Sequence, residues 1–297
     1  MDRNKIDSLI IDRPEDGIFK IHADAYRSDE IFELEMKYIF EGGWMFVGLD
    51  CQAPNPHDYF TVKLGRQPII ISRDSKGQLH CLINSCRHRG ALVCHHTSGN
   101  ARAHICPYHA WTYNSAGENV GITEREAGGY TPAFDEVDHS LRRVAKFGSY
   151  RGFLFASLNA DVPSLEDHLG DASLFIDMVV DQSSDGIELV PGIANYTYDG
   201  NWKMQIENSA DVYHFMPTHQ SFLKILNSRA NNTAAADSPY RNRNVDAVRR
   251  GSFCFKYGHN AMWGGGDKVD ARPLYLSREA VEKRVGAKRL KWMLYTR

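Results

Sequence analysis

The order of apolar and polar positions changes character twice along the chain. Residues 29–40 repeat apolar side chains with a helical period and predict an amphipathic helix. Between residues 44 and 158, short apolar runs alternate with clusters of Asn, Pro, Asp, Ser and Gly. Such spacing predicts a small antiparallel β domain of roughly 110 residues.

Helical patterns return after residue 160. Ser164 followed three residues later by Asp167 predicts the start of a helix over residues 164–182. Apolar periodicity then predicts one strand, 188–198, and two further helices, 202–215 and 277–295. We therefore expect an α+β fold in which a small antiparallel β domain is inserted in a larger α+β domain. The expected boundaries are 1–40 for a helical part of the larger domain, 41–159 for the β domain and 160–297 for the rest.

Composition adds limits to this picture. The 297 residues include 35 Lys and Arg against 37 Asp and Glu, and 42% of the residues are hydrophobic. These values describe a globular protein, and the near-neutral charge argues against a dedicated nucleic-acid binder. No apolar run reaches the roughly 18 residues of a membrane span, and no apolar stretch of a signal peptide follows Met1. We expect a cytoplasmic protein.

Two short loops each combine one Cys with one His. Cys86-Arg87-His88 and Cys106-Pro107-Tyr108-His109 form a C-x-H motif, 17 intervening residues and a C-x-x-H motif. Structural zinc prefers Cys pairs and His pairs. One Cys and one His on each loop instead suit a [2Fe–2S] centre in which one iron takes both thiolates and the other both imidazoles, the Rieske arrangement. Zinc, or four unrelated buried residues, are the alternatives.

The residues around these loops fit the same centre. Gly90 allows close approach of the backbone, Pro107 stiffens the second loop and Trp111 is placed to shield the cluster from water. Two neutral imidazoles in place of two thiolates make the centre less negative, so it accepts an electron at a higher potential.

A second cluster of chemistry-bearing residues lies in the segment 207–219. Asp211 and His214 are three apart, which places them on one face of a helix. His219 would point elsewhere on a straight helix, but Pro217 is expected to bend the chain and turn His219 back. Two His presented in this way resemble part of the 2-His-1-carboxylate triad of non-haem Fe(II) oxygenases. Taken alone, the spacing D-x-x-H-x4-H also fits a polar helix end.

With both motifs present, the chain resembles the large (α) subunit of the Rieske non-haem iron aromatic-ring-hydroxylating dioxygenases. The C-x-H-R-G and C-P-Y-H-A-W loops and the segment E-N-S-A-D-V-Y-H-x4-H carry this resemblance. Four further segments are similar to the benzoate and anthranilate 1,2-dioxygenase branch: residues 32–42, 65–69, 150–162 and 198–203.

The resemblance implies roles for particular residues. It implies that the [2Fe–2S] cluster is held by Cys86, His88, Cys106 and His109, and the mononuclear iron by His214 and His219. Asp211 is then a bridge that hydrogen-bonds His214 and, across a subunit contact, His109 of a neighbouring protomer, and so passes an electron and a proton. Asn208 matches a position near the iron pocket. By the same resemblance, residues 41–159 are the Rieske domain and the flanking parts belong to the catalytic domain.

The function implied is that of the terminal oxygenase of a multicomponent dioxygenase in aromatic hydrocarbon catabolism. Both atoms of O2 would enter a monocyclic aromatic acid, such as benzoate or anthranilate, and give a cis-dihydrodiol. The sequence shows no dinucleotide-binding fingerprint, so NADH is expected to act through a separate reductase, with or without a ferredoxin. The expected assembly is an α3β3 complex with a small β subunit, or an α3 homotrimer, with no membrane and no nucleic acid.

The chain also departs from the family. The family's α subunits are longer, and the carboxylate that completes the iron triad has no counterpart here in the expected context. We therefore expect a C-terminally truncated chain whose catalytic domain is incomplete. Tyr108 and Ala110 stand where Phe and Gly are frequent, and these changes look harmless.

Three competing functions remain open on sequence alone. A Rieske monooxygenase, such as a salicylate hydroxylase or an O-demethylase, would use identical metal ligands. A pure electron-transfer Rieske protein would need only the β domain and would not need Asp211, His214 and His219. A zinc-binding interaction module would use the four Cys and His ligands without labile sulfide.

Overall fold

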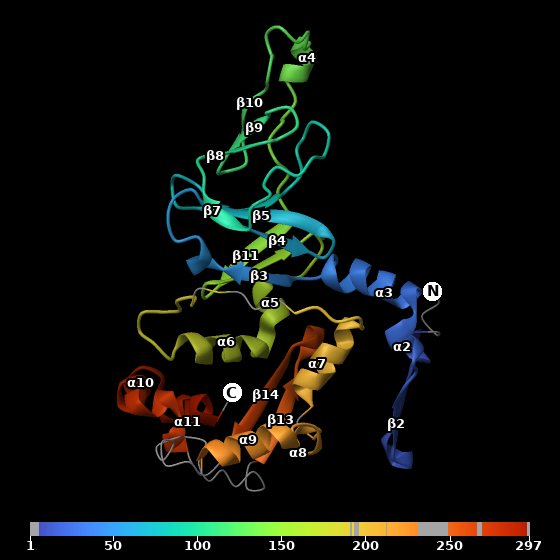
Figure 1. Cartoon of the computed structure of the whole chain (residues 1–297), viewed down its shortest axis with the longest axis vertical. Helices are drawn as coiled ribbons and strands as arrows, with labels where there is room; N and C mark the ends of the chain where they lie inside the picture. The colour runs from blue at the N-terminus through green and yellow to red at the C-terminus, as the bar shows by residue number, and fades with distance from the viewer. Residues whose placement is uncertain are drawn as a thin grey trace. The chain divides into compact units, whose positions relative to one another are not determined.

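The computed structural model describes residues 6–190, 192, 196–211, 213–230, 249–265 and 269–295 (Figure 1). The chain forms two compact units. Unit 1 comprises Met1–Asp167 and Glu188–Pro191, and unit 2 comprises His168–Ile187 and Gly192–Arg297. In the described parts of both units, no helix is long and apolar enough to cross a membrane.

Unit 1 is mainly antiparallel sheet, as the sequence predicts. One sheet has the strand order β6-β5-β4-β7, a second β10-β9-β8 and a third β11-β12-β3, and β1 pairs with β2. The strands of these sheets are β1 (Ile10–Arg13), β2 (Ile18–Ile21), β3 (Met45–Leu49), β4 (Asp58–Leu64), β5 (Gln67–Arg73), β6 (Leu79–Ile83), β7 (Ser98–Asn100), β8 (Ala103–Ile105), β9 (Thr112–Asn114), β10 (Asn119–Gly121), β11 (Lys146–Tyr150) and β12 (Phe153–Ser157).

The helices of unit 1 are short. The amphipathic pattern at residues 29–40 forms α3 (Asp29–Glu35), which continues as a π-helical turn over Met36–Phe40. Ser28 caps this helix, because its hydroxyl accepts a hydrogen bond from the N–H of Ile31. The other helices are α2 (Asp24–Arg27), α4 (Pro132–Asp135), α5 (Leu165–Leu169) and two 3-10 turns, Pro14–Asp16 and Asp50–Gln52.

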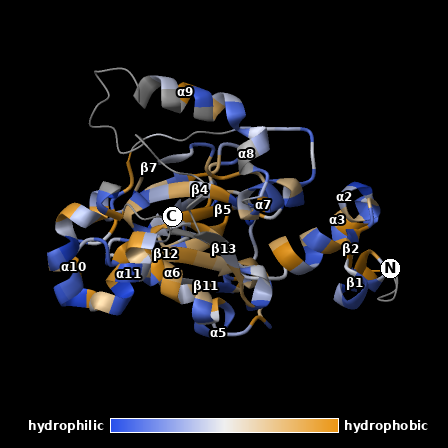
Figure 2. Ribbon diagram, turned by 90° about the horizontal axis from the view of Figure 1, so that it is seen from below, coloured by the Kyte–Doolittle hydropathy of each residue, from blue (hydrophilic) through white to orange (hydrophobic). Residues whose placement is uncertain are grey.

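The central strand β5 separates two hydrophobic cores. Side chains alternate between the faces of a strand, so Ile69 and Ile71 enter one core, with residues of β3 and β12 such as Leu154. Ile70 enters the other core, which contains both Cys86 and Cys106. Figure 2 shows the apolar positions along β4 and β5. Through Ile70, the apolar run of β5 therefore packs in the same core as the cysteines of the two loops.

Unit 2 combines helices with a β-hairpin. Its elements are α6 (Ser173–Val180), α7 (Trp202–Ala210), α8 (Phe215–Thr218), α9 (Gln220–Ala230), β13 (Arg249–Cys254), β14 (Asn260–Gly265), α10 (Arg278–Val285) and α11 (Ala287–Tyr295), with 3-10 turns at Gly170–Ala172, Lys256–Gly258, Val269–Ala271 and Pro273–Ser277. The core of unit 2 joins α6 to the last two helices through Met178, Val281 and Leu290. Arg289 adds ion pairs to Asp177 and Asp181 on the same side of α6.

Four predicted elements differ from the observed ones. The helix expected over 164–182 is interrupted by a 3-10 turn at Gly170–Ala172, where Gly170 has a φ of 45°. The helix expected over 277–295 is two helices, because Gly286 has a φ of 82° and breaks the helical hydrogen bonding. No strand forms in the described part of residues 188–198, and residues 191 and 193–195 lie outside the described residues.

The helix expected over 202–215 ends at Ala210. Its end has a local cause: the carboxylate of Asp211 accepts hydrogen bonds from the backbone N–H groups of Tyr213 and His214. An Asp side chain that bonds the following backbone in this way favours a turn over a continuing helix. Asp211 and His214 therefore lie in a turn and not on one helix face.

Candidate metal centres

The two Cys- and His-bearing loops have the same backbone hydrogen bonds. In the first loop, the N–H of Cys86 donates to Ala91 and the N–H of Gly90 donates back to Cys86. In the second, the N–H of Cys106 donates to Trp111 and the N–H of Ala110 donates back to Cys106. The sequence spacings differ by one residue, yet each loop presents its cysteine at the same point of a turn of the same size.

Both turns use the left-handed backbone region at the same position. Gly90 has a φ of 76° and Ala110 a φ of 55°. A Cβ on Gly90 would meet Oγ of Ser85 at an ordinary contact distance of 3.7 Å, so the backbone conformation is the reason that this position favours glycine. Ala110 adopts the same conformation with a Cβ, at a cost of about 1–2 kcal/mol. Alanine at this position therefore has a local energetic cost that glycine would not have.

The two cysteines are buried in one apolar cluster. Cys86 is 4% exposed and Cys106 is 2% exposed, and both pack in the core that contains Trp111 and Tyr113. The hydroxyl of Tyr113 lies 3.2 Å from Sγ of Cys86 and accepts a hydrogen bond from the N–H of Arg87. Burial raises the pKa of Tyr113, so the phenol keeps its proton and can donate it to the sulfur.

The two histidines lie side by side at the end of these loops. The ring centroids of His88 and His109 are 4.6 Å apart, and Trp111 stacks on His88 with an interplanar angle of 14°. Burial by these neighbours lowers the pKa of His88, with added effects of the His109 and Arg89 charges. His88 is therefore neutral at pH 7, the form in which an imidazole binds metal.

These residues fit a [2Fe–2S] cluster with two thiolate and two imidazole ligands. In the part of the chain that the structure describes, no group of three or more His, Cys, Asp or Glu side chains is arranged around one metal ion. A Rieske cluster does not require such a group, because each of its irons takes two protein ligands. The donor set of two buried sulfurs and two adjacent imidazoles suits a cluster better than a single ion.

The second predicted site lies in unit 2. Nδ1 of His214 is 3.0 Å from the carboxylate of Asp211, and the ring centroid of His219 is 5.4 Å from that of His214. His219 follows α8, which contains Pro217, and the chain turns there so that the two rings meet. A carboxylate can only accept here, so Nδ1 of His214 carries the proton and Nε2 is free for a metal.

The hydrogen bonds at Asp211 also fix its charge. The backbone N–H of Tyr213 is the main cause that lowers the pKa of Asp211, and the side chain of His214 adds to this effect. Asn208 lies on α7, and its side chain is exposed. Three of the carboxylates that follow His219, namely Asp237, Asp246 and Asp267, lie outside the described residues.

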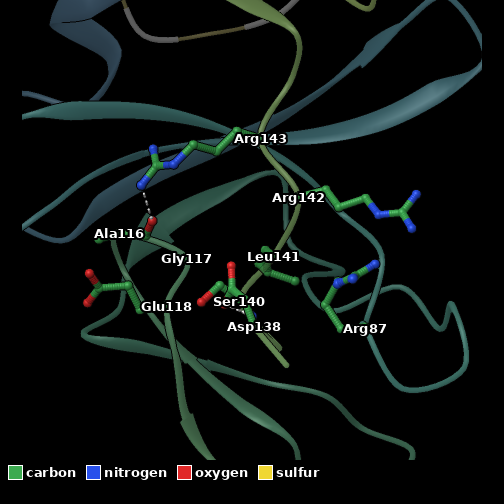
Figure 3. Close-up of a pocket in the computed structure, with 9 residues that line it drawn as sticks. All are labelled: Arg87, Ala116, Gly117, Glu118, Asp138, Ser140, Leu141, Arg142 and Arg143. Carbon is green, nitrogen blue, oxygen red and sulfur yellow. Dashed lines mark hydrogen bonds between the residues drawn. The ribbon is translucent and has the colours of Figure 1, made fainter. Parts of the chain in front are cut away.

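A separate polar pocket of about 490 Å3 borders the first loop of unit 1 (Figure 3). Its charged lining residues are Arg87, Glu118, Asp138, Arg142 and Arg143. Arg143 donates one hydrogen bond to the carbonyl of Ala116 and another to the buried His80. Arg87 connects this pocket to the predicted metal sites, because it lies between Cys86 and His88 in sequence. The other lining residues are further from the predicted ligands in sequence.

Sequence reasoning missed three contributors to the first centre. Tyr113 contacts Sγ of Cys86, Thr123 bonds the carbonyl of His109, and His139 packs on Trp111. Tyr113 has a sequence signal, because it lies two residues after Trp111 in β9, where a strand residue faces the same side as that indole. Thr123 and His139 have no such signal, since their contacts depend on the return of a long loop.

Comparison with known proteins agrees with this geometry. Residues 43–139 match the Rieske [2Fe-2S] domain family. The chain is 38% identical to the toluate 1,2-dioxygenase subunit alpha of Pseudomonas putida, over 97% of this chain and 64% of that protein. It is also 38% identical to the anthranilate 1,2-dioxygenase large subunit of Acinetobacter baylyi, over 99% of this chain and 64% of that protein.

A solved structure shows the same fold. The naphthalene 1,2-dioxygenase from Rhodococcus sp. bound to indole matches with a TM-score of 0.73 and 27% identity, over 90% of this chain and 59% of that one. The chain thus spans a little under two thirds of the relatives that it matches. The α+β fold class predicted from the sequence is confirmed. Within that span, the chain is similar to the large subunits of the Rieske aromatic-ring-hydroxylating dioxygenases.

Proposed function

We propose that Cys86, His88, Cys106 and His109 hold a Rieske [2Fe–2S] cluster. Two observations support this ligand set: the two loops repeat the same hydrogen bonds around buried cysteines, and their imidazoles are adjacent. When bound, such a cluster stores one electron at a higher potential than an all-thiolate cluster. Trp111 stacks on His88 and Tyr113 bonds Cys86, so these two side chains exclude water from the site and orient its ligands.

A mononuclear Fe(II) is proposed at His214 and His219. Asp211 fixes the tautomer of His214 and keeps its negative charge at neutral pH, as a bridge between an electron donor and this site would require. We keep Asn208 as a residue near the iron pocket. Residues 41–159 are then the Rieske domain, and residues 1–40 and 160–297 belong to the catalytic domain.

The proposed activity is that of the terminal oxygenase of a ring-hydroxylating dioxygenase. Both atoms of O2 would enter a monocyclic aromatic acid and give a cis-dihydrodiol. The proposed substrate class rests on the 38% identity to relatives that are named for toluate and anthranilate. The proposed assembly has three α subunits, as α3β3 or α3, and would bring Asp211 of one protomer against His109 of the next. Electrons come from NADH through a separate reductase, with or without a ferredoxin.

A cytoplasmic location is part of this proposal. The six cysteines are free thiols in the structure, and free thiols are usual in a reducing compartment.

The cluster assignment is tested by reconstitution of the chain with iron and sulfide under anaerobic conditions. We expect two irons and two labile sulfides per chain at this site, and an electron paramagnetic resonance signal after reduction with dithionite. Replacement of Cys106 by Ser should abolish that signal, while replacement of the exposed Cys254 by Ser should leave it unchanged. A colourless protein that holds zinc without labile sulfide would instead identify an interaction module.

The oxygenase assignment needs a product test on the complete subunit with its electron donor. With labelled O2, a dioxygenase places two labelled atoms in one cis-diol. A single labelled atom would identify a monooxygenase of the salicylate hydroxylase or O-demethylase type. A preparation that functions fully without mononuclear iron would identify a pure electron-transfer protein.

A further inference from the structure

The segment 123–139 contacts both imidazole-bearing loops, and we call it the clamp segment. It follows β10, contains α4 and returns toward β11, and Figure 1 shows α4 beyond the strands β8, β9 and β10. An exposed ion pair between Arg125 and Asp135, with an N–O distance of 2.6 Å, ties its beginning to α4. None of the proposed metal ligands lies in this segment.

The imidazole of His88 needs external support. His88 is exposed, and its aromatic neighbours in the described part of the chain are His109 and Trp111. Trp111 is 3% exposed and lies nearly parallel to His88, with ring centroids 5.0 Å apart. A flat stack of this kind restricts the rotation of the imidazole about its own χ2. The indole is therefore the surface that sets the plane of His88.

The clamp segment also contacts the indole of Trp111. The rings of His139 and Phe134 meet Trp111 nearly edge-on, with centroid distances of 5.4 and 6.0 Å. His139 and Phe134 stack on each other at 4.0 Å, and Nε2 of His139 donates a hydrogen bond of 2.8 Å to the carbonyl of Phe134. This bond locks the ring of His139 against Phe134, so the two residues act on Trp111 as one rigid body.

The other end of the segment reaches the second loop. The hydroxyl of Thr123 donates a hydrogen bond of 2.7 Å to the backbone carbonyl of His109. The same loop already carries the left-handed Ala110, which follows His109 directly. A bond to that carbonyl limits the rotation of the peptide between the two residues, and with it the position of the His109 side chain.

We propose that the clamp segment orients both imidazole ligands of the cluster, through Phe134 and His139 on the His88 side and through Thr123 on the His109 side. These three are positioning residues, since none of them contacts the cluster ligands' nitrogens. The inference rests on the proposed cluster site. Residues that orient metal ligands tune the electronic properties of the metal as well as its retention.

The decisive experiment compares two threonines of the same segment. Thr123→Val removes the hydroxyl that bonds His109, Thr123→Ser retains it, and Thr131→Val is the matched control, because the side chain of Thr131 makes no capping hydrogen bond. His139→Leu and Phe134→Leu test the other side. Each full chain is reconstituted, and its labile sulfide, its far-ultraviolet circular dichroism, the g-values of its reduced form and its reduction potential are measured.

We expect Thr123→Val and His139→Leu to keep the fold and the labile sulfide. Their g-values and their reduction potentials should both shift from those of the wild type. Thr123→Ser and Thr131→Val should match the wild type. Unchanged g-values and potentials in Thr123→Val, His139→Leu and Phe134→Leu would overturn the clamp and leave the cluster assignment intact. A wild-type chain that takes up no labile sulfide would overturn both. Since the Thr123 hydroxyl is at the surface, its removal separates orientation from folding even if Phe134→Leu unfolds.

Discussion

Individual residues in the two Cys- and His-bearing loops and around them have contacts and backbone conformations that their positions in the sequence do not reveal. Tyr113 reads as one more strand residue of β9, yet its hydroxyl lies 3.2 Å from Sγ of Cys86. Ala110 reads as an inert replacement for glycine, yet its φ is 55°. Both effects depend on how one side chain or one peptide is placed in space, and each can be measured separately.

Replacement of Tyr113 by Phe should lower the reduction potential of the cluster. A hydrogen bond to a ligand sulfur stabilises the extra negative charge of the reduced state, so its loss favours the oxidised state. The change leaves the buried ring in place, so the fold should persist. Potentiometric titration checks the sign, with Tyr38→Phe, at an exposed position of residues 29–40, as the control. A potential equal to that of the wild type would mean that the hydroxyl does not act on the sulfur.

Replacement of Ala110 by Gly should stabilise the metal-free chain by about 0.5 kcal/mol. The left-handed conformation costs alanine about 1–2 kcal/mol, and the freedom that glycine gains in the unfolded state offsets about 0.4–1 kcal/mol of this. Chemical denaturation measures the difference. Ala116→Gly is the matched control in a neighbouring turn without a positive φ, and it should destabilise the chain. Equal losses in both variants would contradict the strain at Ala110.

At the scale of secondary-structure elements, periodicity located the segments better than it located their ends. The helix at residues 29–40 and the antiparallel strands expected between residues 44 and 158 are present. Three helices end early or divide, and each break has a local cause that propensity underestimates. Gly170 and Gly286 adopt positive φ, and Asp211 bonds the backbone ahead of it. Helical periodicity continues past such residues because it measures side-chain pattern and not backbone conformation.

The contact between His168 and His259, which precedes β14, should make unit 2 sensitive to acid. The rings of His168 and His259 are 4.7 Å apart, and Nε2 of His259 donates to the carbonyl of His168. Burial, and then the charge of His259, lower the pKa of His168 to about 4. The folded state therefore binds fewer protons than the unfolded state, whose imidazole has a pKa of about 6.5. The stability is fully present above that value and is lost as the pH falls toward 4.

Replacement of His168 by Gln should flatten this dependence. One proton accounts for at most about 1.4 kcal/mol per pH unit, and the effect should be smaller because the half-buried imidazole is partly screened by water. Thermal unfolding of the metal-free chain between pH 7 and pH 4 measures the slope, with the exposed His95→Gln as the control. Identical slopes in the wild type and in His168→Gln would assign the acid sensitivity to other groups.

At the scale of the whole molecule, the two proposed metal sites lie in different compact units of the chain. Cys86, His88, Cys106 and His109 belong to unit 1, and Asp211, His214 and His219 belong to unit 2. If the working centre forms between protomers, loss of the cluster in one chain and loss of the iron in another should complement each other. The two defects then reside in different copies of the protein, and each copy supplies what the other lacks.

Complete subunits that carry Cys106→Ser should be inactive, as should those that carry His214→Ala. Mixed oligomers formed by coexpression in equal amounts should recover about a quarter of the wild-type activity, since this fraction of cyclic contacts joins an intact cluster to an intact iron site. Oxygenase turnover of the purified mixed oligomer checks this value. A mixture with no activity, despite demonstrated mixed assembly, would place electron transfer within one chain.

The sequence by itself determined which donor atoms this protein offers to a metal. One Cys and one His lie on each of two loops and two His follow an Asp, and these donor types favour iron centres because ligand preference depends on atom type. The apolar pattern also determined the α+β class, because the burial of apolar side chains is a property of whole segments.

Only the tertiary structure decided which residues orient those donors. The contacts of Thr123, Phe134 and His139 join positions that are up to 28 residues from the loop that they support, counted from Trp111 to His139. The turn at Asp211 likewise depends on hydrogen bonds and not on helical period. Directional contacts between distant residues depend on how the chain returns on itself, and the order of amino acids does not state this directly.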